Sequence, residues 1–473
     1  MERPLCRELW GPREVARYRE GPGGRIERIR GAGGSLAARL RRAAARVLLP
    51  QGFPDSVSPD YLRYQCWDSG QALCSSLCGA LSTRSVLQAV GVGDAAATVT
   101  AASLAWLLRD GVGIVTRITF AWLQGSHLDC EAKQWRLAAD LLNDAALALE
   151  LLAPAWPRAG PALLLLAAAV KCVVGVAGGA TRAALAVHQA RSDNVADVAA
   201  KDGSQETLVN GAGLLLALGL LPLLDGRPWL TAAVAALLVA GHVTCNVGAV
   251  RSLCLRAPNR PRLRLALRAA LRGGASAGGG QSAGGGACEG AGLRLQVPPP
   301  EDVNPQEPLL PGFGSRLRIH LGAPLHLLVQ SEAEFRKALE CGTEDYIIVL
   351  KPWQGWVGVG LRAGAPPEAS LRALAQTLLL EELLGPSLPP GAPAGTRLRP
   401  IQDTLRRCPR GSVPWAALAE TTRVWGELGP VLLGALSAAG WEVERPLLAP
   451  DEWRLSWPRA QTGATGRTGN DSR

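Results

Sequence analysis

Two long apolar segments joined by a short break limit most strongly what this chain can fold into. Residues 208–224 and 229–250 are mostly leucine, alanine, valine and glycine, and the four letters DGRP separate them. A helix needs about 20 apolar residues to cross roughly 30 Å of hydrocarbon. The second segment meets that length with His242 and Asn246 as its polar exceptions, and the first is slightly shorter. We therefore predict a hairpin of two membrane-spanning helices.

Two earlier apolar segments, residues 95–108 and 161–176, carry charges beside or within them. Arg109 and Lys171 are costly in lipid unless they face protein or water. These segments therefore also fit helices buried in protein, and we assign membrane spans to the hairpin alone. A row of small residues with four-residue spacing, which lets helices approach closely in membranes, lies at Gly175, Gly179 and Ala183.

Arginines gather after the second apolar segment, whereas the turn of the hairpin carries only Arg227. The positive-inside rule therefore places the outer ends of the hairpin, and the region that follows, in the cytosol. Near a bilayer, basic side chains also attract anionic lipid headgroups, although a solvated basic tail fits the same pattern. The residues that we assign to anionic lipid are Arg251, Arg256, Arg260, Arg262 and Arg264.

The amino-terminal region is basic and lacks the apolar core of a signal peptide. From residue 35 the run SLAARLRRAAARVLL predicts an amphipathic helix that lies on an anionic membrane or packs on the next domain. The net charge of +10 does not predict nucleic-acid binding, because no aromatic residues interleave with the arginines. Eleven cysteines, several in apolar runs, favour a reducing, intracellular compartment over a disulfide framework.

A second domain is expected after the stretch 273–292, whose glycines and serines predict a flexible linker. Within this domain DYIIVLKPWQGWVGVGL predicts two strands around a turn, and PEASLRALAQTLLLEELL predicts a helix. VLLGALSAAG predicts another helix that ends at Gly440. WEVE and EWRLSW predict short strands.

These patterns predict a mainly α protein, with a multi-helix membrane-associated bundle followed by a small α+β C-terminal domain. The predicted divisions are a basic N-terminal region 1–44, a helical membrane domain 45–255, a basic and Gly/Pro-rich linker 256–315, a small α+β domain 316–460 and a disordered tail 461–473.

Charged residues also cluster before the hairpin. Between residues 182 and 206 the charges nearly balance, which predicts paired contacts at the membrane edge, and the candidates are Arg182, Lys201, Asp202 and Glu206. We further hypothesise that Arg182 enters the bundle and pairs with Asp140 or Asp144, since these groups would otherwise lack partners.

Asp140 and Asp144 also permit a second interpretation. They stand four residues apart on one helix face and could share a divalent metal. Arg136, four residues before Asp140, instead favours an ordinary ion pair on a helix surface. The five histidines and the pair Cys74 and Cys78 lack the spacing of a zinc site, so we predict no metal.

Several long strings resemble the root UVB-sensitive family: LLPQGFPDSVSPDYLRYQCWDSGQALCSSLCGALSTRSVLQAVGVG, KQWRLAADLLND, AGGATRAALAVHQAR and AKDGSQETLVN. The resemblance covers residues 45–255. It implies a connection with seedling development, ultraviolet-B responses, auxin transport and vitamin B6 homeostasis, which are roles of the plant members, often in plastids. It implies no defined enzymatic activity, so no catalytic residue or cofactor is assigned.

We therefore expect a non-enzymatic, intracellular membrane protein that acts as a scaffold or as an accessory to transport or metabolite homeostasis, with vitamin B6 as the candidate metabolite. Membrane lipid and an unidentified protein are the expected partners. Two alternatives remain: a metal-dependent membrane enzyme that uses Asp140 and Asp144, and a soluble helical interaction protein whose apolar helices form an ordinary core.

Overall fold

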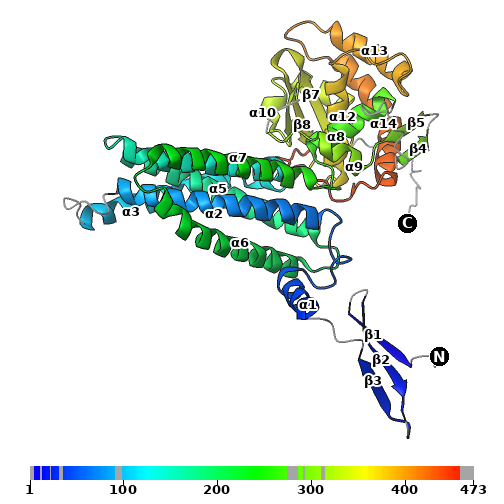
Figure 1. Cartoon of the computed structure of the whole chain (residues 1–473). Coiled ribbons are helices and arrows are strands. Elements are labelled where there is room, and N and C mark those ends of the chain that lie inside the picture. Colours follow the sequence, from blue (N-terminus) through cyan, green and yellow to red (C-terminus); the bar gives the residue numbers. More distant parts are fainter. Residues whose placement is uncertain are drawn as a thin grey trace, which may run out of the picture. The chain divides into compact units, whose positions relative to one another are not determined.

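A computed structural model describes residues 5–10, 13–21, 23–30, 36–90, 99–273, 286–290, 293–310 and 315–458. The chain forms two compact units, Met1–Leu128 with Trp135–Leu253, and Asp129–Gln134 with Cys254–Arg473. The first unit is dominated by long helices, and the second combines helices with a small sheet (Figure 1). The prediction of a mainly α chain with a sheet-containing C-terminal region is confirmed.

Long helices follow one another in the first unit. They are α1 (Leu36–Leu48), α2 (Tyr61–Ala89), α3 (Val99–Leu128), α4 (Ala132–Leu152), α5 (Gly160–Gln189), α6 (Val195–Leu223) and α7 (Pro228–Ser252). The first three residues of α4 belong to the second unit. The amphipathic helix expected from residue 35 is confirmed as α1.

Three strands precede α1, although the sequence analysis predicted none there. They are β1 (Cys6–Trp10), β2 (Arg13–Glu20) and β3 (Ile26–Arg30), and they form an antiparallel sheet in sequence order. Cross-strand ion pairs join Arg28 to Glu8 at 2.8 Å and Arg19 to Glu27 at 2.9 Å. The alternation of arginine and glutamate in this region therefore supports a sheet, a pattern that the analysis of net charge overlooked.

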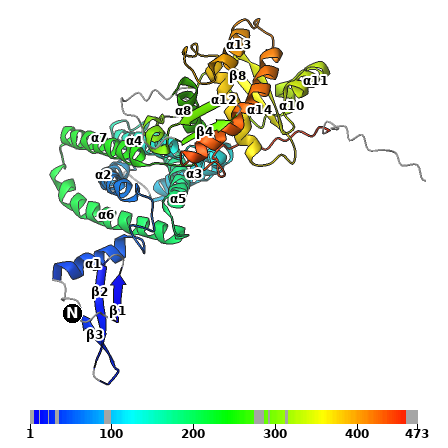
Figure 2. The same cartoon turned by 90° about the vertical axis from the view of Figure 1, so that its right-hand side faces the viewer.

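Helix α2 lies between α6 and α7, and both pack along it (Figures 1 and 2). The short break between the two apolar segments is confirmed, because α6 ends at Leu223 and α7 begins at Pro228. The hairpin itself is more open than predicted, since each of its helices contacts α2 far more than it contacts the other. Helix α3 packs mainly on α5.

Close approach of these helices depends on glycines other than the predicted ones. A Cβ atom at Gly248 in α7 would lie 2.6 Å from the ring of Trp67 in α2, and one at Gly213 in α6 would lie 2.6 Å from Ser76 Oγ. At Gly175 and Gly179 a Cβ would meet no described atom within 4 Å. The predicted small-residue contact at Gly175 and Gly179 of α5 is therefore wrong. Close contacts are made on α2 and also between α3 and α5, where a Cβ at Gly113 would lie 2.9 Å from Cys172 Sγ.

The second unit contains a three-stranded sheet covered by helices. Its strand order is β6–β8–β7, with β8 parallel to β6 and antiparallel to β7. The predicted pair of strands around a turn is confirmed as β7 and β8, and the two predicted helices as α12 and part of α14. The elements are α8 (Arg260–Arg272), β4 (Gly286–Gly290), β5 (Leu293–Val297), α9 (Pro300–Val303), β6 (Arg318–Leu321), α10 (Leu325–Leu328), α11 (Glu332–Cys341), β7 (Tyr346–Lys351), β8 (Trp356–Leu361), α12 (Glu368–Leu383), α13 (Gly395–Arg406) and α14 (Trp415–Ala438).

Part of the segment predicted as a linker, 256–315, is ordered in this unit. Helix α8 buries one apolar face in the core, formed by Leu263, Ala266, Leu267, Ala270 and Leu271. This spacing of three and four residues is typical of an amphipathic helix. The helix was not predicted, because the many arginines of this segment were assigned to a basic linker. Most of the glycine-rich stretch and the tail 461–473 lie outside the described residues.

The short strands predicted at WEVE and EWRLSW are wrong. Residues 441–444 include a turn, and residues 452–457 form no strand, although Leu455 makes an isolated bridge with Arg362. Trp441 is buried, and its indole nitrogen donates to the Pro298 carbonyl at 3.0 Å. The alternation of apolar and polar residues that predicted strands is therefore due to single tryptophan side chains, such as Trp441, that pack on the core.

We predict that Gly248→Val lowers the stability of the chain in detergent by about 1–3 kcal/mol, because the added methyl groups collide with Trp67 at the contact of α2 and α7. Thermal unfolding of the purified protein measures this. Gly179→Val is the matched control, since its Cβ would meet open space. Equal melting temperatures for the two variants would show that α2 and α7 do not pack in this register.

Candidate functional site

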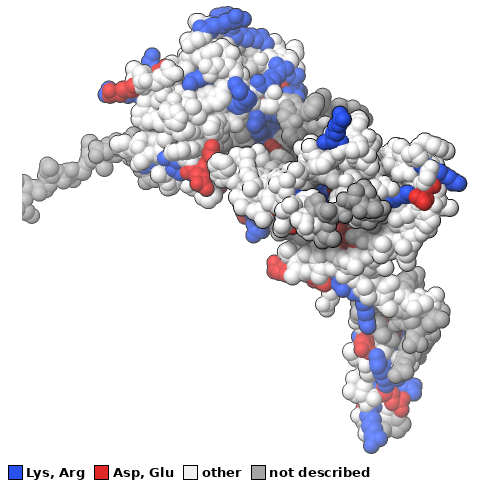
Figure 3. Space-filling view, turned by 90° about the vertical axis from the view of Figure 1, so that its left-hand side faces the viewer, with Lys and Arg blue, Asp and Glu red and all other residues white. Residues whose placement is uncertain are grey.

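The first unit carries apolar side chains on its surface and charged side chains in its interior. Exposed fractions reach 70% for Leu215, 72% for Trp229 and 73% for Leu237. Figure 3 shows that much of the bundle surface facing the viewer is without lysine, arginine, aspartate or glutamate, whereas these residues gather on the N-terminal sheet. The buried polar side chains of this unit include those of Asp68, Gln71, Arg136, Asp140, Asp144, Glu150, His242 and Asn246.

Within the described residues of this unit, three helices are long and apolar enough to cross a membrane: α5, α6 and α7. The sequence analysis assigned spans only to the last two. It set α5 aside because of Lys171, but that side chain is paired with Glu150 of α4 at 2.5 Å. A charge that is neutralised inside the bundle no longer argues against a membrane helix.

The centre of the buried network joins α2 to α4. Arg136 Nη2 of α4 donates to Asp68 Oδ1 of α2 at 2.8 Å, and Arg136 Nε lies 3.7 Å from Asp140 Oδ2. The hydroxyl of Tyr64 donates to Asp68 at 3.5 Å. Arg136 does pair with Asp140, but the pair is buried, so the prediction of a helix-surface ion pair is wrong.

His242 of α7 contacts both α4 and α2. Its Nδ1 makes a hydrogen bond of 3.0 Å with Asp144 Oδ2 of α4, and its Nε2 lies 2.8 Å from Gln71 Nε2 of α2. A carboxylate only accepts hydrogen bonds, so Nδ1 carries a proton; Nε2 then accepts the amide proton of Gln71. The ring is completely buried. Glycines in the contact of α2 and α7, such as Gly241 facing Cys74, allow the helices to approach closely enough for these bonds.

A second cluster lies near the first turns of α2. It contains the charged residues that were predicted to form paired contacts at the membrane edge. Arg182 of α5 contacts Asp202 at 3.1 Å and Glu206 at 2.6 Å, both on α6. Gln65 donates to the same Asp202 at 3.1 Å. Lys201 donates to the carbonyl of Arg46 at 2.6 Å. The hypothesis that Arg182 pairs with Asp140 or Asp144 is therefore wrong: those aspartates contact Arg136 and His242 instead.

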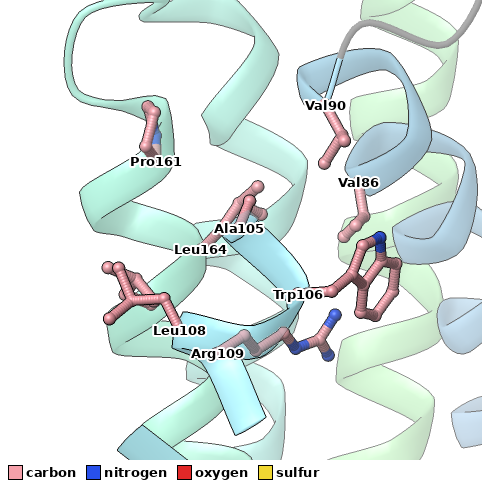
Figure 4. Close-up of a pocket in the computed structure, with 9 residues that line it drawn as sticks. Val86, Val90, Ala105, Trp106, Leu108, Arg109, Pro161 and Leu164 are labelled. Atoms are coloured by element: carbon pink, nitrogen blue, oxygen red, sulfur yellow. The ribbon is translucent and has the colours of Figure 1, made fainter. Parts of the chain in front are cut away.

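A third cluster surrounds Glu150 of α4. Ser82 of α2 donates to its carboxylate, Lys171 lies at 2.5 Å and Arg109 of α3 at 3.9 Å. The Arg109 guanidinium also lies over the ring of Trp106, 5.0 Å from its centre. Figure 4 shows both side chains at a small pocket that is otherwise apolar and lies among α2, α3 and α5.

Asp68, Gln71 and Glu150 were not predicted from the sequence. A signal was present, because Gln65, Asp68 and Gln71 recur every three residues and so share one face of α2. Their partners lie on helices distant in the sequence, and no local pattern predicts which helices meet. Among the described residues, no group of three or more His, Cys, Asp or Glu is placed to hold a metal. Asp140 contacts Arg136, whereas Asp144 contacts His242.

Several arginines of the second unit pair with carboxylates of the same unit. Arg262 is buried and lies 3.2 Å from Glu307, which also lies 3.3 Å from Lys133. Burial alone would raise the pKa of Glu307, but the two cations outweigh it and lower that pKa. Arg264 lies 2.8 Å from Glu381. Of the arginines assigned to lipid, these two are therefore engaged with protein carboxylates, and Arg256 lies 3.8 Å from Glu301.

Both units match known protein families. Residues 35–274 match the model described as "Vitamin B6 photo-protection and homoeostasis domain", and residues 296–457 match "Root UVB sensitive protein, C-terminal". The chain belongs to the root UVB-sensitive family. The resemblance noted in the sequence is thereby confirmed, and the family regions include both the helical bundle and the unit with the sheet.

Curated relatives in the root UVB-sensitive family come from amoeba and plant. RUS family member 1 of Dictyostelium discoideum is 45% identical over 219 residues, 46% of this chain and 42% of the relative. Protein root UVB sensitive 3 of Arabidopsis thaliana is 38% identical over 292 residues, 61% of either chain. The chain thus spans less than two thirds of these two relatives. Protein root UVB sensitive 2, chloroplastic, from the same plant is 29% identical and covers 68% of this chain and 69% of the relative. No solved structure matches.

We predict that Arg136→Gln destabilises the first unit by about 3–5 kcal/mol, because it leaves the carboxylates of Asp68 and Asp140 buried without their cation. A large fall in melting temperature in detergent and in cellular abundance measures the effect. Arg117→Gln, on an exposed position of α3, is the control and should leave both unchanged. A stable Arg136→Gln protein would mean that Arg136 does not neutralise this cluster.

Proposed function

We propose that this chain is an integral membrane protein of an intracellular membrane that takes part in vitamin B6 homeostasis as a scaffold or as an accessory to transport. The observation that carries the membrane part is the reversed polarity of the first unit. Its leucines face outward on α6 and α7, while its ion pairs lie inside.

The energetics favour lipid around these helices. Apolar surface in water costs about 25 cal/mol for each Å², so a fully exposed leucine side chain costs on the order of 2 kcal/mol. Leu214, Leu215, Leu216 and Leu218 of α6 are each more than half exposed. In a bilayer that cost disappears, whereas the interior ion pairs remain necessary because lipid solvates no charge.

The metabolic part rests on the family. The description of the model matched by residues 35–274 refers to vitamin B6 photo-protection and homoeostasis. The name of one matched relative places that protein in the chloroplast, and an organelle membrane is consistent with it. The buried polar groups of the bundle contact one another across its helices, and this arrangement supports a role as a scaffold or an accessory.

The orientation follows from the positive-inside rule. Arg251 at the end of α7 is exposed, and further arginines follow it in the sequence, whereas the turn between α6 and α7 carries Arg227 alone. We propose that the second unit lies in the cytosol and that Arg251 contacts anionic headgroups.

The membrane proposal predicts that the full chain stays in the pellet after alkaline carbonate extraction of cell membranes and enters the supernatant only with detergent. The reason is that α5, α6 and α7 are long enough to span the bilayer. A peripheral protein in the same sample controls the extraction. Release of the chain by carbonate alone would favour the soluble alternative.

The metabolic proposal predicts that cells lacking this chain have altered pools of pyridoxal, pyridoxine and pyridoxal 5′-phosphate, measured by mass spectrometry. Re-expression of the wild-type chain should restore the pools, and so should Arg117→Gln, because that side chain is exposed and outside the buried network. Unchanged pools in the deleted cells would reject a role in vitamin B6 homeostasis and leave the membrane proposal intact.

A further inference from the structure

A polar pocket of the second unit takes no part in the buried networks described above. It is formed by α11 with the residue Gln330 before it, by the turn between β7 and β8, and by the loop that leads into α14. Its volume is about 400 Å³, which is within the range of sites that hold small metabolites. The charged and aromatic residues of its lining are Glu334, Lys337, Lys351, Trp353 and Trp415.

Lysine is rare in this chain, and two lysines line this one pocket. Of the 50 lysines and arginines, five are lysine: Lys133, Lys171, Lys201, Lys337 and Lys351. The first three lie outside the pocket, and each donates a hydrogen bond to a protein oxygen. Two lysines in one pocket of so arginine-rich a chain favour a use for the compact primary ammonium group, which the planar guanidinium of arginine does not reproduce.

Neither of the pocket lysines is neutralised by a carboxylate. Within the described part of the chain, Lys337 and Lys351 form no ion pair. Lys351 Nζ donates to the carbonyl of Leu327 at 2.9 Å and lies 5.1 Å from the centre of the Trp356 ring. These contacts hold the ammonium group of Lys351 at the wall of the pocket, and its charge remains available to an anion.

The carboxylate of Glu334 also belongs to the lining, but it is directed to its own helix. It accepts a hydrogen bond from the backbone N–H of Gln330 at 2.7 Å, and the backbone N–H of Glu334 donates to Ser331 Oγ at 3.2 Å. These reciprocal bonds cap the start of α11. With two lysines and one glutamate in its described lining, the pocket has a net positive charge.

Two tryptophans supply apolar surface beside these charges. Trp353 lies in the turn between β7 and β8 and is 37% exposed. Trp415 begins α14 and packs on the core with part of its surface left exposed. An exposed aromatic ring costs free energy in water, and a planar ring that stacks on it removes that cost. The pocket therefore offers two different contacts, one for an anion and one for a planar ring.

We propose that this pocket binds a small phosphorylated metabolite with a planar ring, with its phosphate against Lys337 and Lys351 and its ring against Trp353. The ammonium group of lysine is a common partner of phosphate, because it is a compact charge with three donors. Phosphorylated vitamin B6 has both features, a phosphate group and a planar pyridine ring. The choice of this metabolite rests on the proposed role in vitamin B6 homeostasis, whereas the class of ligand follows from the lining.

The test is a calorimetric titration of the full chain in detergent, in a buffer free of phosphate, with pyridoxine 5′-phosphate as the probe. This compound has no aldehyde, so it forms no imine with lysines elsewhere in the chain. We expect saturable binding to a single site. Pyridoxine and inorganic phosphate should each bind about tenfold more weakly or worse, because each lacks one of the two features that the pocket contacts.

Lys337→Gln should weaken the binding of pyridoxine 5′-phosphate by about tenfold, because the phosphate loses one cation. The Lys337 side chain is exposed, so the variant should fold. Arg336→Gln is the matched control: it removes the same charge from the next residue, which pairs with Glu332 at 2.6 Å outside the pocket, and the affinity should not change. Trp353→Leu should weaken the binding of pyridoxine 5′-phosphate and leave that of inorganic phosphate unchanged.

The proposal is overturned if pyridoxine 5′-phosphate does not bind, if inorganic phosphate binds equally well, or if Lys337→Gln and Arg336→Gln lose the same affinity. Tighter binding of adenosine 5′-monophosphate would support a site for a phosphate and a ring and would overturn its assignment to vitamin B6. The pool measurement separates this proposal from the metabolic one. Altered vitamin B6 pools without binding reject only the pocket, and binding with unchanged pools rejects only the metabolic role.

Discussion

The need to neutralise charge inside a helical bundle with an apolar exterior governs this structure. Arg136 satisfies that need at the centre by contacting Asp68 and Asp140 on two helices. The close packing of α7 on α2, which Gly248 permits, brings His242 to Asp144 and completes the network. An apolar surface around a polar interior is the arrangement that the proposed membrane location requires, because helices in lipid have no other place for ionised groups.

The second unit neutralises its charged side chains in a different way. Helix α8 turns its leucines into an ordinary core and directs Arg264, Arg268 and Arg272 to Glu381 and Glu382 of α12, partly in contact with solvent. Such pairs are worth little by themselves, since water screens them. Stability here comes mainly from burial of apolar surface, whereas in the first unit a missing partner leaves a charge stranded.

The sequence predicted features that depend on neighbouring residues and missed those that depend on distant ones. The break between α6 and α7 and the β7–β8 pair follow from local turn signals and apolar runs, so both were predicted. The partner of Arg182 was predicted wrongly, because Asp202 and Asp140 are equally plausible until the packing of α5 on α6 is known. His242 was noted only as a polar exception, since its role requires two other helices.

The spacing of the clusters along α2 is close to the thickness of a bilayer. Gln65 and Ser82 are separated by about 26 Å of helix, close to the thickness of the hydrocarbon layer. In the proposed membrane location the two clusters would lie at the two faces of the bilayer, and the basic side chains of Arg182 and Lys171 are partly exposed there, by 38% and 30%. His242 and Asp144 lie between these levels, where burial of titratable groups costs most. Apolar side chains would cost less at that level, and the contacts of His242 with Asp144 and Gln71 offset part of the cost of burying these polar groups.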